Sequence, residues 1–85
     1  MTETIAAIST GLSNSGISII RISGPETFHV MDRIFRGKKS GKKLSEQKTH
    51  TIHYGFICDG EEIVDEVLVS VMRAPHTYTA EDVAE

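Results

Sequence analysis

The sequence predicts an α+β domain, in which one amphipathic helix packs on a face of a small mixed β-sheet. One segment has apolar residues spaced as on one face of a helix, and several others show the continuous or alternating apolar pattern of strands. The 85 residues allow one small domain at most, which we assign to residues 1–85. A chain of this length buries about 60% of its unfolded surface, so we expect a thin core that a partner or a further segment completes.

Two strands are expected near the N-terminus. Residues 4–9, TIAAIS, are small and β-branched, and the turn-rich TGLSNSG follows them, which predicts a strand and then a loop. Residues 17–23, ISIIRIS, are almost continuous in isoleucine. That composition predicts a central strand buried on both faces.

A helix is expected over residues 25–36. Ser23 lies three residues before Glu26, which is the spacing of a capping box, and Pro25 falls in the first turn, where its missing N–H costs nothing. The predicted apolar stripe consists of Phe28, Met31, Ile34 and Phe35. Gly37 is then the expected left-handed residue that stops the helix.

A β-hairpin is expected over residues 50–72, after a basic and aperiodic segment, residues 38–48, that predicts a mobile surface loop. The residues from His50 to Cys58 alternate as in a strand, and the acidic DGEE sequence that begins at Asp59 is a turn signal. An extended apolar pattern resumes after this turn, so the two arms are predicted to pair in antiparallel fashion.

The C-terminal tail is predicted to form one capped helical turn. Thr79 is a good capping residue, and Asp82 follows three positions later. The sequence then stops at Glu85 in the middle of this pattern, so we expect the domain to be incomplete at its C-terminal end.

The composition limits the classes of function. Nine Lys and Arg against twelve Asp and Glu give a net charge of −3, which is the wrong sign for a free-standing nucleic-acid binder. Cys58 is the one cysteine, and a lone thiol suits a reducing compartment. The sequence has neither a signal-peptide pattern nor an apolar run long enough to cross a membrane. We therefore expect a cytoplasmic protein with no membrane contact.

Catalytic and metal motifs fail on spacing. Two segments superficially resemble phosphate-binding loops. The one that begins at Gly37 has its glycines one residue too close, Lys43 in place of Ser or Thr, and a helix before it, whereas the one that begins at Gly11 has Ile17 in place of the lysine and a strand after it. His50 and His53 would point to opposite faces of a strand, so we expect no shared metal ion. The segment by itself is therefore predicted to carry no catalytic motif and no metal site.

Arg21 is the first candidate functional residue that remains once catalytic and metal motifs are excluded. It lies among isoleucines, and a guanidinium in such a place needs a partner because burying an unpaired charge is prohibitive. A structural ion pair, or an arginine that reaches solvent at the strand end, is the more common arrangement. The alternative is a clamp for an anion or a heterocycle.

The basic segment is the second feature. Its cations are Arg36, Lys38, Lys39, Lys42 and Lys43. Such a cluster can contact RNA phosphates, which would make the chain an RNA-binding accessory module through residues 36–43. A solvated loop is the simpler interpretation, because the segment contains no interleaved aromatic residue.

The sequence also resembles a known family. Five segments, in order and with matching spacing, carry the resemblance: TIAAIST, GISIIRISGPE, HTIHYGFICDG, IVDEVLVSVMRAPHTYT and AEDVAE. They are similar to the N-terminal domain of the MnmE (TrmE) family of bacterial tRNA modification GTPases. The resemblance covers essentially the whole chain apart from the basic loop, and its specificity lies in the ordered set.

The resemblance implies a fold like the tetrahydrofolate-binding part of the glycine-cleavage T protein, and a homodimer with a folate near its interface. The family's folate-contacting arginine, in the motif IxRxSG, falls on Arg21, and its glutamate, at the end of EDVxE, falls on Glu85. The implied cofactor is 5-formyl- or methylene-tetrahydrofolate. A purely structural oligomerisation domain is the remaining alternative.

The resemblance also implies what the whole protein does. Full-length members hydrolyse GTP with Mg²⁺ and K⁺ in a later GTPase domain, which this segment lacks. With the flavoprotein MnmG they modify C5 of the wobble uridine of certain tRNAs. The activity of an enzyme is thus implied for the family member as a whole.

Overall fold

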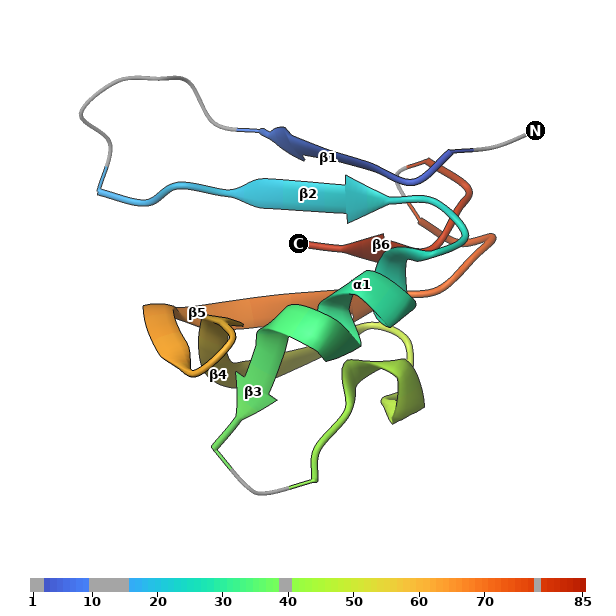
Figure 1. Ribbon diagram of the computed structural model, residues 1–85. Coiled ribbons are helices and arrows are strands. Elements are labelled where there is room, and N and C mark those ends of the chain that lie inside the picture. Colours follow the sequence, from blue (N-terminus) through green and yellow to red (C-terminus); the bar gives the residue numbers. More distant parts are fainter. Residues whose placement is uncertain (1–2, 10–15, 39–40, 78) are drawn as a thin grey trace.

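The computed structural model describes residues 3–9, 16–38, 41–77 and 79–85, and it shows one helix on one face of an antiparallel sheet (Figure 1). In chain order the elements are β1 (Ile5–Ile8), β2 (Ile20–Ser23), α1 (Thr27–Ile34), β3 (Phe35–Gly37), the 3-10 turn η1 (Leu44–Glu46), β4 (Thr51–Asp59), β5 (Glu62–Met72) and β6 (Val83–Ala84). The predicted α+β class, with one main helix packed on a sheet, is confirmed.

The sheet has the strand order β1-β2-β6-β5-β4-β3. Every strand pair that the structure describes is antiparallel, so the predicted mixed sheet is wrong in this respect. The reason lies in β6, which runs antiparallel to both of its neighbours, β2 and β5. The C-terminus therefore lies in the middle of the sheet (Figure 1).

The hairpin of β4 and β5 confirms the predicted antiparallel pair and its turn after Asp59. Its register runs from Thr51 opposite Val71 to Asp59 opposite Glu62, with one irregularity after Ile57. Gly60 in the turn has a φ of 61°, a left-handed value that costs glycine little. His50 precedes the strand and lies outside it, so the predicted start of this arm is one residue early.

The helix is shorter than predicted, and its ends differ from the expected signals. No side chain caps its N-terminus; Ser23, the predicted cap, instead shares a hydrogen bond of 2.7 Å with the Thr79 hydroxyl. Gly37 does not stop the helix either. The chain leaves the helix after Ile34 because β3 starts at once and pairs with β4, a strand that the sequence did not predict.

Strand β2 lies inside the sheet, as predicted, but it is not buried on both faces. It begins at Ile20 and not at Ile17, and both of these isoleucines are exposed, whereas Ile22 is buried. The neighbouring β1 is an edge strand whose residues are all exposed. Because α1 packs against the other end of β2, the isoleucines near its start have no covering layer.

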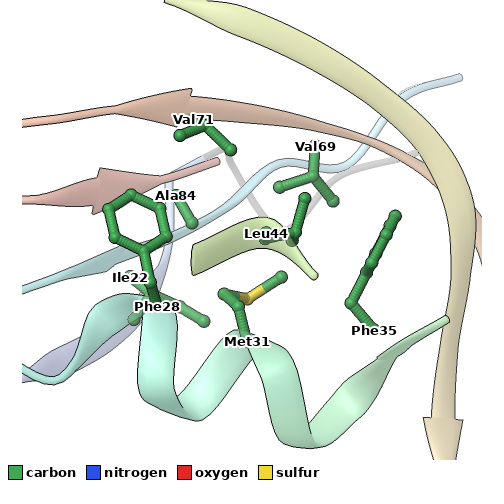
Figure 2. Close-up of a cluster of buried hydrophobic side chains, with 8 residues drawn as sticks. All are labelled: Ile22, Phe28, Met31, Phe35, Leu44, Val69, Val71 and Ala84. Carbon is green, nitrogen blue, oxygen red and sulfur yellow. The ribbon is translucent and has the colours of Figure 1, made fainter. Parts of the chain in front are cut away.

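The core lies between α1 and the strands (Figure 2). Its members are Ile22, Phe28, Met31, Phe35, Leu44, Val69, Val71 and Ala84. Leu44 is fully buried, and Figure 2 shows it at the centre of the group. The prediction of a surface loop over 38–48 is therefore wrong at Leu44, whose side chain is buried in the core.

Polar contacts also hold this loop. Asp32 accepts hydrogen bonds from the backbone N–H of Ser45, at 3.1 Å, and from its hydroxyl. Arg73 donates from Nη2 to the carbonyl oxygens of Ser45 and Gln47, at 2.7 and 2.8 Å. Residues 39–40, the remaining part of the predicted loop, lie outside the described residues.

The tail forms a strand where a helical turn was expected, so this prediction is wrong. β6 enters the sheet between β2 and β5, and backbone hydrogen bonds continue the ladder past it: Ser70 and Glu85 exchange two, at 2.7 and 3.1 Å. Two strand ladders satisfy more backbone groups than a single capped turn would.

No helix in the described part of the chain is long and apolar enough to cross a membrane.

Candidate functional site

The candidate site lies on the sheet face that points away from α1, which we call the outer face. Ile22 of β2 and Ala84 of β6 are cross-strand partners, and both belong to the core under the helix. Side chains alternate along a strand, so the neighbouring positions Arg21 and Glu85 fall on the outer face. The short β6 thus places Glu85 beside Arg21, although 64 positions separate them in the sequence.

Arg21 and Glu85 form an ion pair in the centre of the sheet. The Nη2 and Nε atoms of Arg21 lie 2.6 and 2.7 Å from Oε2 of Glu85, so two N–H groups of the guanidinium point at one carboxylate oxygen. The exposed fractions of the two side chains are 34% and 19%. The structure therefore brings together the two residues that the sequence singled out, in a partly solvated environment.

The contact has the geometry of a structural ion pair, because each side chain is the partner of the other. The guanidinium is less buried than the run of isoleucines suggested, since β2 is exposed near its start. The described bonds between the two residues end on one carboxylate oxygen, Oε2. A carboxylate has two acceptor oxygens and a guanidinium has five donors, so this contact alone does not use all of their hydrogen-bonding groups.

A second group of polar side chains continues the site along β2. Ser23 is two positions beyond Arg21 on the same face, and its hydroxyl contacts the Thr79 hydroxyl at 2.7 Å and donates to Oε2 of Glu81 at 3.2 Å. The sequence predicts Ser23 as a helix cap, and this arrangement shows that prediction to be wrong. The signal was the spacing of two between Arg21 and Ser23, which places both on one strand face.

This arrangement suits recognition of a planar polar heterocycle. A guanidinium and a carboxylate side by side present a row of donors next to acceptors, which complements a ring edge with alternating N–H and carbonyl groups. Two shallow hollows occur elsewhere, one of about 260 Å³ beside Cys58 and one of about 230 Å³ beside Lys42. Neither hollow is lined by Arg21 or Glu85, so a ligand at the pair needs a further wall.

His53 lies buried on the helix side, where its Nε2 contacts the Thr51 hydroxyl at 2.7 Å. Burial and, to a smaller extent, the charge of Lys42 lower the pKa of His53. Among the described residues, no three His, Cys, Asp or Glu side chains gather as metal ligands would.

The basic cluster lies at the opposite edge of the sheet, along β3. Of its five cations, Arg36, Lys38, Lys42 and Lys43 are described, and Lys39 lies outside the described residues. Tyr54 of β4 is close to this edge, and its hydroxyl donates to Glu66. That hydrogen bond, with smaller contributions from burial and from the charge of Glu66, raises the pKa of Tyr54.

Comparisons with known proteins extend these observations. The family described as "GTP-binding protein TrmE N-terminus" matches residues 4–85. The chain is 62% identical to the tRNA modification GTPase MnmE of Lachnoclostridium phytofermentans, over 99% of its own residues and 18% of that protein. The identities to the proteins of the same name from Parabacteroides distasonis and Bacillus subtilis are 54% and 52%, each over 98% of the chain. The chain thus spans about 18% of the length of these relatives.

Proposed function

The chain belongs to the TrmE N-terminal family, and from this premise we propose that residues 1–85 bind a reduced folate and join two subunits of a tRNA modification GTPase. The whole protein hydrolyses GTP, with Mg²⁺ and K⁺, in a separate domain. With the flavoprotein MnmG it modifies C5 of the wobble uridine of its tRNA substrates in the cytoplasm. The fold is that of the tetrahydrofolate-binding part of the glycine-cleavage T protein.

The ion pair of Arg21 and Glu85 is the observation that supports the folate site. A reduced pterin has adjacent N–H donors that a carboxylate accepts as a pair, and a carbonyl edge that a guanidinium can donate to. Glu85 therefore holds the N–H edge of 5-formyl- or methylene-tetrahydrofolate. Arg21 binds an acceptor edge or a carboxylate of the same ligand, and the Ser23 hydroxyl lies on the same strand face.

The bound folate supplies a one-carbon unit to the tRNA modification. The residues of this chain bind and orient it. Arg21 and Glu85 hold each other in place before the ligand arrives, so little side-chain entropy is lost on binding. Binding and assembly are the roles that we propose for this segment.

Ligand binding is expected to stabilise the intact protein against heat. At a 5-formyltetrahydrofolate concentration of about 100 times its Kd, the stabilisation is about 2.7 kcal/mol by mass action. Scanning calorimetry measures the shift of the unfolding midpoint, with p-aminobenzoylglutamate, the half of the ligand that lacks the pterin, as the control. A midpoint that does not move, or that moves equally with the control, contradicts pterin recognition and favours a purely structural domain.

The outer face also supports a homodimer. Ile52 and Tyr54 of β4 and Leu68 of β5 are exposed there, and Tyr54 and Leu68 are direct cross-strand partners. They lie on the same face as the ion pair, so a second subunit that covers them also supplies the missing wall of the folate site. Apolar side chains of this size on a sheet centre are typical of subunit interfaces.

The substitution Leu68→Glu is expected to weaken dimerisation at least about tenfold, because it places a charge in an apolar contact. Leu68 is 68% exposed, so the subunit itself has room for the change. Sedimentation equilibrium of the intact protein measures the effect, with Ile8→Glu as the control: Ile8 is also exposed but lies opposite Ile20 on the helix side. A Leu68→Glu protein that dimerises like the wild type would place the interface elsewhere.

A further inference from the structure

A basic hollow lies at the β3 edge of the sheet, far along the strand order from the folate site. It has a volume of about 230 Å³ and is lined by Asp32, Phe35, Arg36, Gly37, Gly41, Lys42 and Lys43. Three of these residues are cations and one is a carboxylate, which gives a net charge of +2 at this place. The whole chain, in contrast, has a net charge of −3.

The acidic member of the hollow is already engaged. Asp32 accepts hydrogen bonds from the N–H and the hydroxyl of Ser45, so its charge is directed at the 3-10 turn. Lys42 is held by packing, because its aliphatic stem lies over Gly37, 3.1 Å from where a Cβ atom would stand. A side chain at position 37 would push this stem away. Lys42 is therefore held in place in part by the fold.

Aromatic side chains stand next to these cations in the structure, although the basic segment itself contains none. The β3–β4 ladder places Phe56 directly opposite Arg36, and the Nζ atom of Lys38 lies 5.8 Å from the centre of the Tyr54 ring. The Tyr54 and Phe56 rings contact each other edge to face, with 5.8 Å between their centres. Lys38 therefore lies with these rings on the outer face, whereas Lys42 lies on the helix side of β3, so cations line both sides of this edge strand.

We propose that this basic edge binds the phosphate backbone of the tRNA substrate, with one phosphate group in the hollow between Arg36, Lys42 and Lys43. The edge strand β3 gives an RNA strand a straight path past cations that lie on both sides of this strand, Lys38 on the outer face and Lys42 on the helix side. The acidic hairpin, with Glu66 bonded to Tyr54, bounds this surface and disfavours a longer track across the sheet.

RNA fits these features better than an acidic protein segment does. A phosphate oxygen accepts from several cations at once, and a hollow of this size is large enough for a phosphate group. Cations on both sides of one edge strand suit the repeated phosphates of a nucleic-acid backbone. The site is separate from the folate site on β2 and β6, and the proposal relies on the proposed function only for the identity of the RNA as tRNA.

The test is the double substitution Lys42→Gln and Lys43→Gln in the intact protein. Glutamine keeps the stem that packs on Gly37 and removes the charge. The Kd for an unmodified tRNA transcript, measured by fluorescence anisotropy over a salt series, is expected to rise about tenfold, and the slope of log Kd against log salt is expected to fall by about one to two. The control is Lys48→Gln, an exposed lysine that follows the 3-10 turn outside the hollow.

Two outcomes would overturn the site. One is an unchanged affinity and salt slope in the double variant. The other is an equal loss in the Lys48→Gln control, which shows a diffuse charge effect. Folate binding by the double variant, read from its thermal midpoint, is expected to match the wild type. A failure of folate binding in the wild type would count against the proposed function alone, because tRNA affinity is measured without folate.

Discussion

Exchanging the two charges of the central pair, Arg21→Glu together with Glu85→Arg, is expected to preserve the fold and to abolish folate binding. The exchanged side chains still attract each other across the same two strands, so the stability of an only partly buried pair changes by no more than about 1 kcal/mol. The N–H edge of the pterin, however, now faces a guanidinium, and its acceptor edge now faces a carboxylate. Thermal unfolding of the intact variant without ligand checks the first half of this expectation.

The double exchange is more informative than either single substitution. In Arg21→Ala the Glu85 carboxylate, 19% exposed, loses the guanidinium that lies 2.6 Å away, and an affinity loss could then arise from a displaced β6. The exchange keeps this contact and changes only what a ligand meets. Two charge-assisted hydrogen bonds contribute about 1.5–3 kcal/mol each, so losing both is expected to weaken binding at least about 100-fold.

The substitution Leu44→Ala is expected to destabilise the domain by about 2–5 kcal/mol, which is a large part of the total for a small domain. Leu44 is 0% exposed and belongs to the core cluster with Met31 and Val69, so its removal leaves a cavity in the centre of the domain. Native-state hydrogen exchange of β5 amides in the intact protein measures the change in the free energy of local unfolding.

A matched control separates core packing from the loss of a large apolar side chain as such. Ile8→Ala removes as many carbon atoms from a side chain that is 57% exposed and lies outside the proposed interface, and its cost in the intact protein is expected to stay within about 0.5 kcal/mol. If Leu44→Ala were equally mild, residues 41–48 would not be anchored in the core. That result would contradict the packing in Figure 2.

The hairpin and the helix could be predicted from the sequence because their signals are local. Alternation from Thr51 onwards and the Asp59-Gly60 turn act within a few residues, and the structure follows them closely. The same holds for the apolar stripe of α1, of which Phe28 and Met31 are buried in the core. The helix ends were less predictable, since Ser23 has a better hydrogen-bond partner in Thr79, a residue from the distant tail.

The remaining elements depend on long-range pairing and could not be read from local patterns. β3 and β6 contain three and two residues and exist because neighbouring strands offer them hydrogen bonds. Leu44 looked like part of a polar loop because its apolar partners come from α1 and β5. Arg21 and Glu85 were assigned by family resemblance, and their contact across 64 positions follows only from the insertion of β6.

Calorimetric titration of 5-formyltetrahydrofolate into the intact wild-type protein and into the Arg21→Glu, Glu85→Arg variant tests the folate site most directly. The predicted result is measurable binding by the wild type and none by the variant at the same concentrations, while both proteins unfold at similar temperatures. Equal affinity for the two proteins would contradict the site, and it would show that the central ion pair only holds β6 in the sheet.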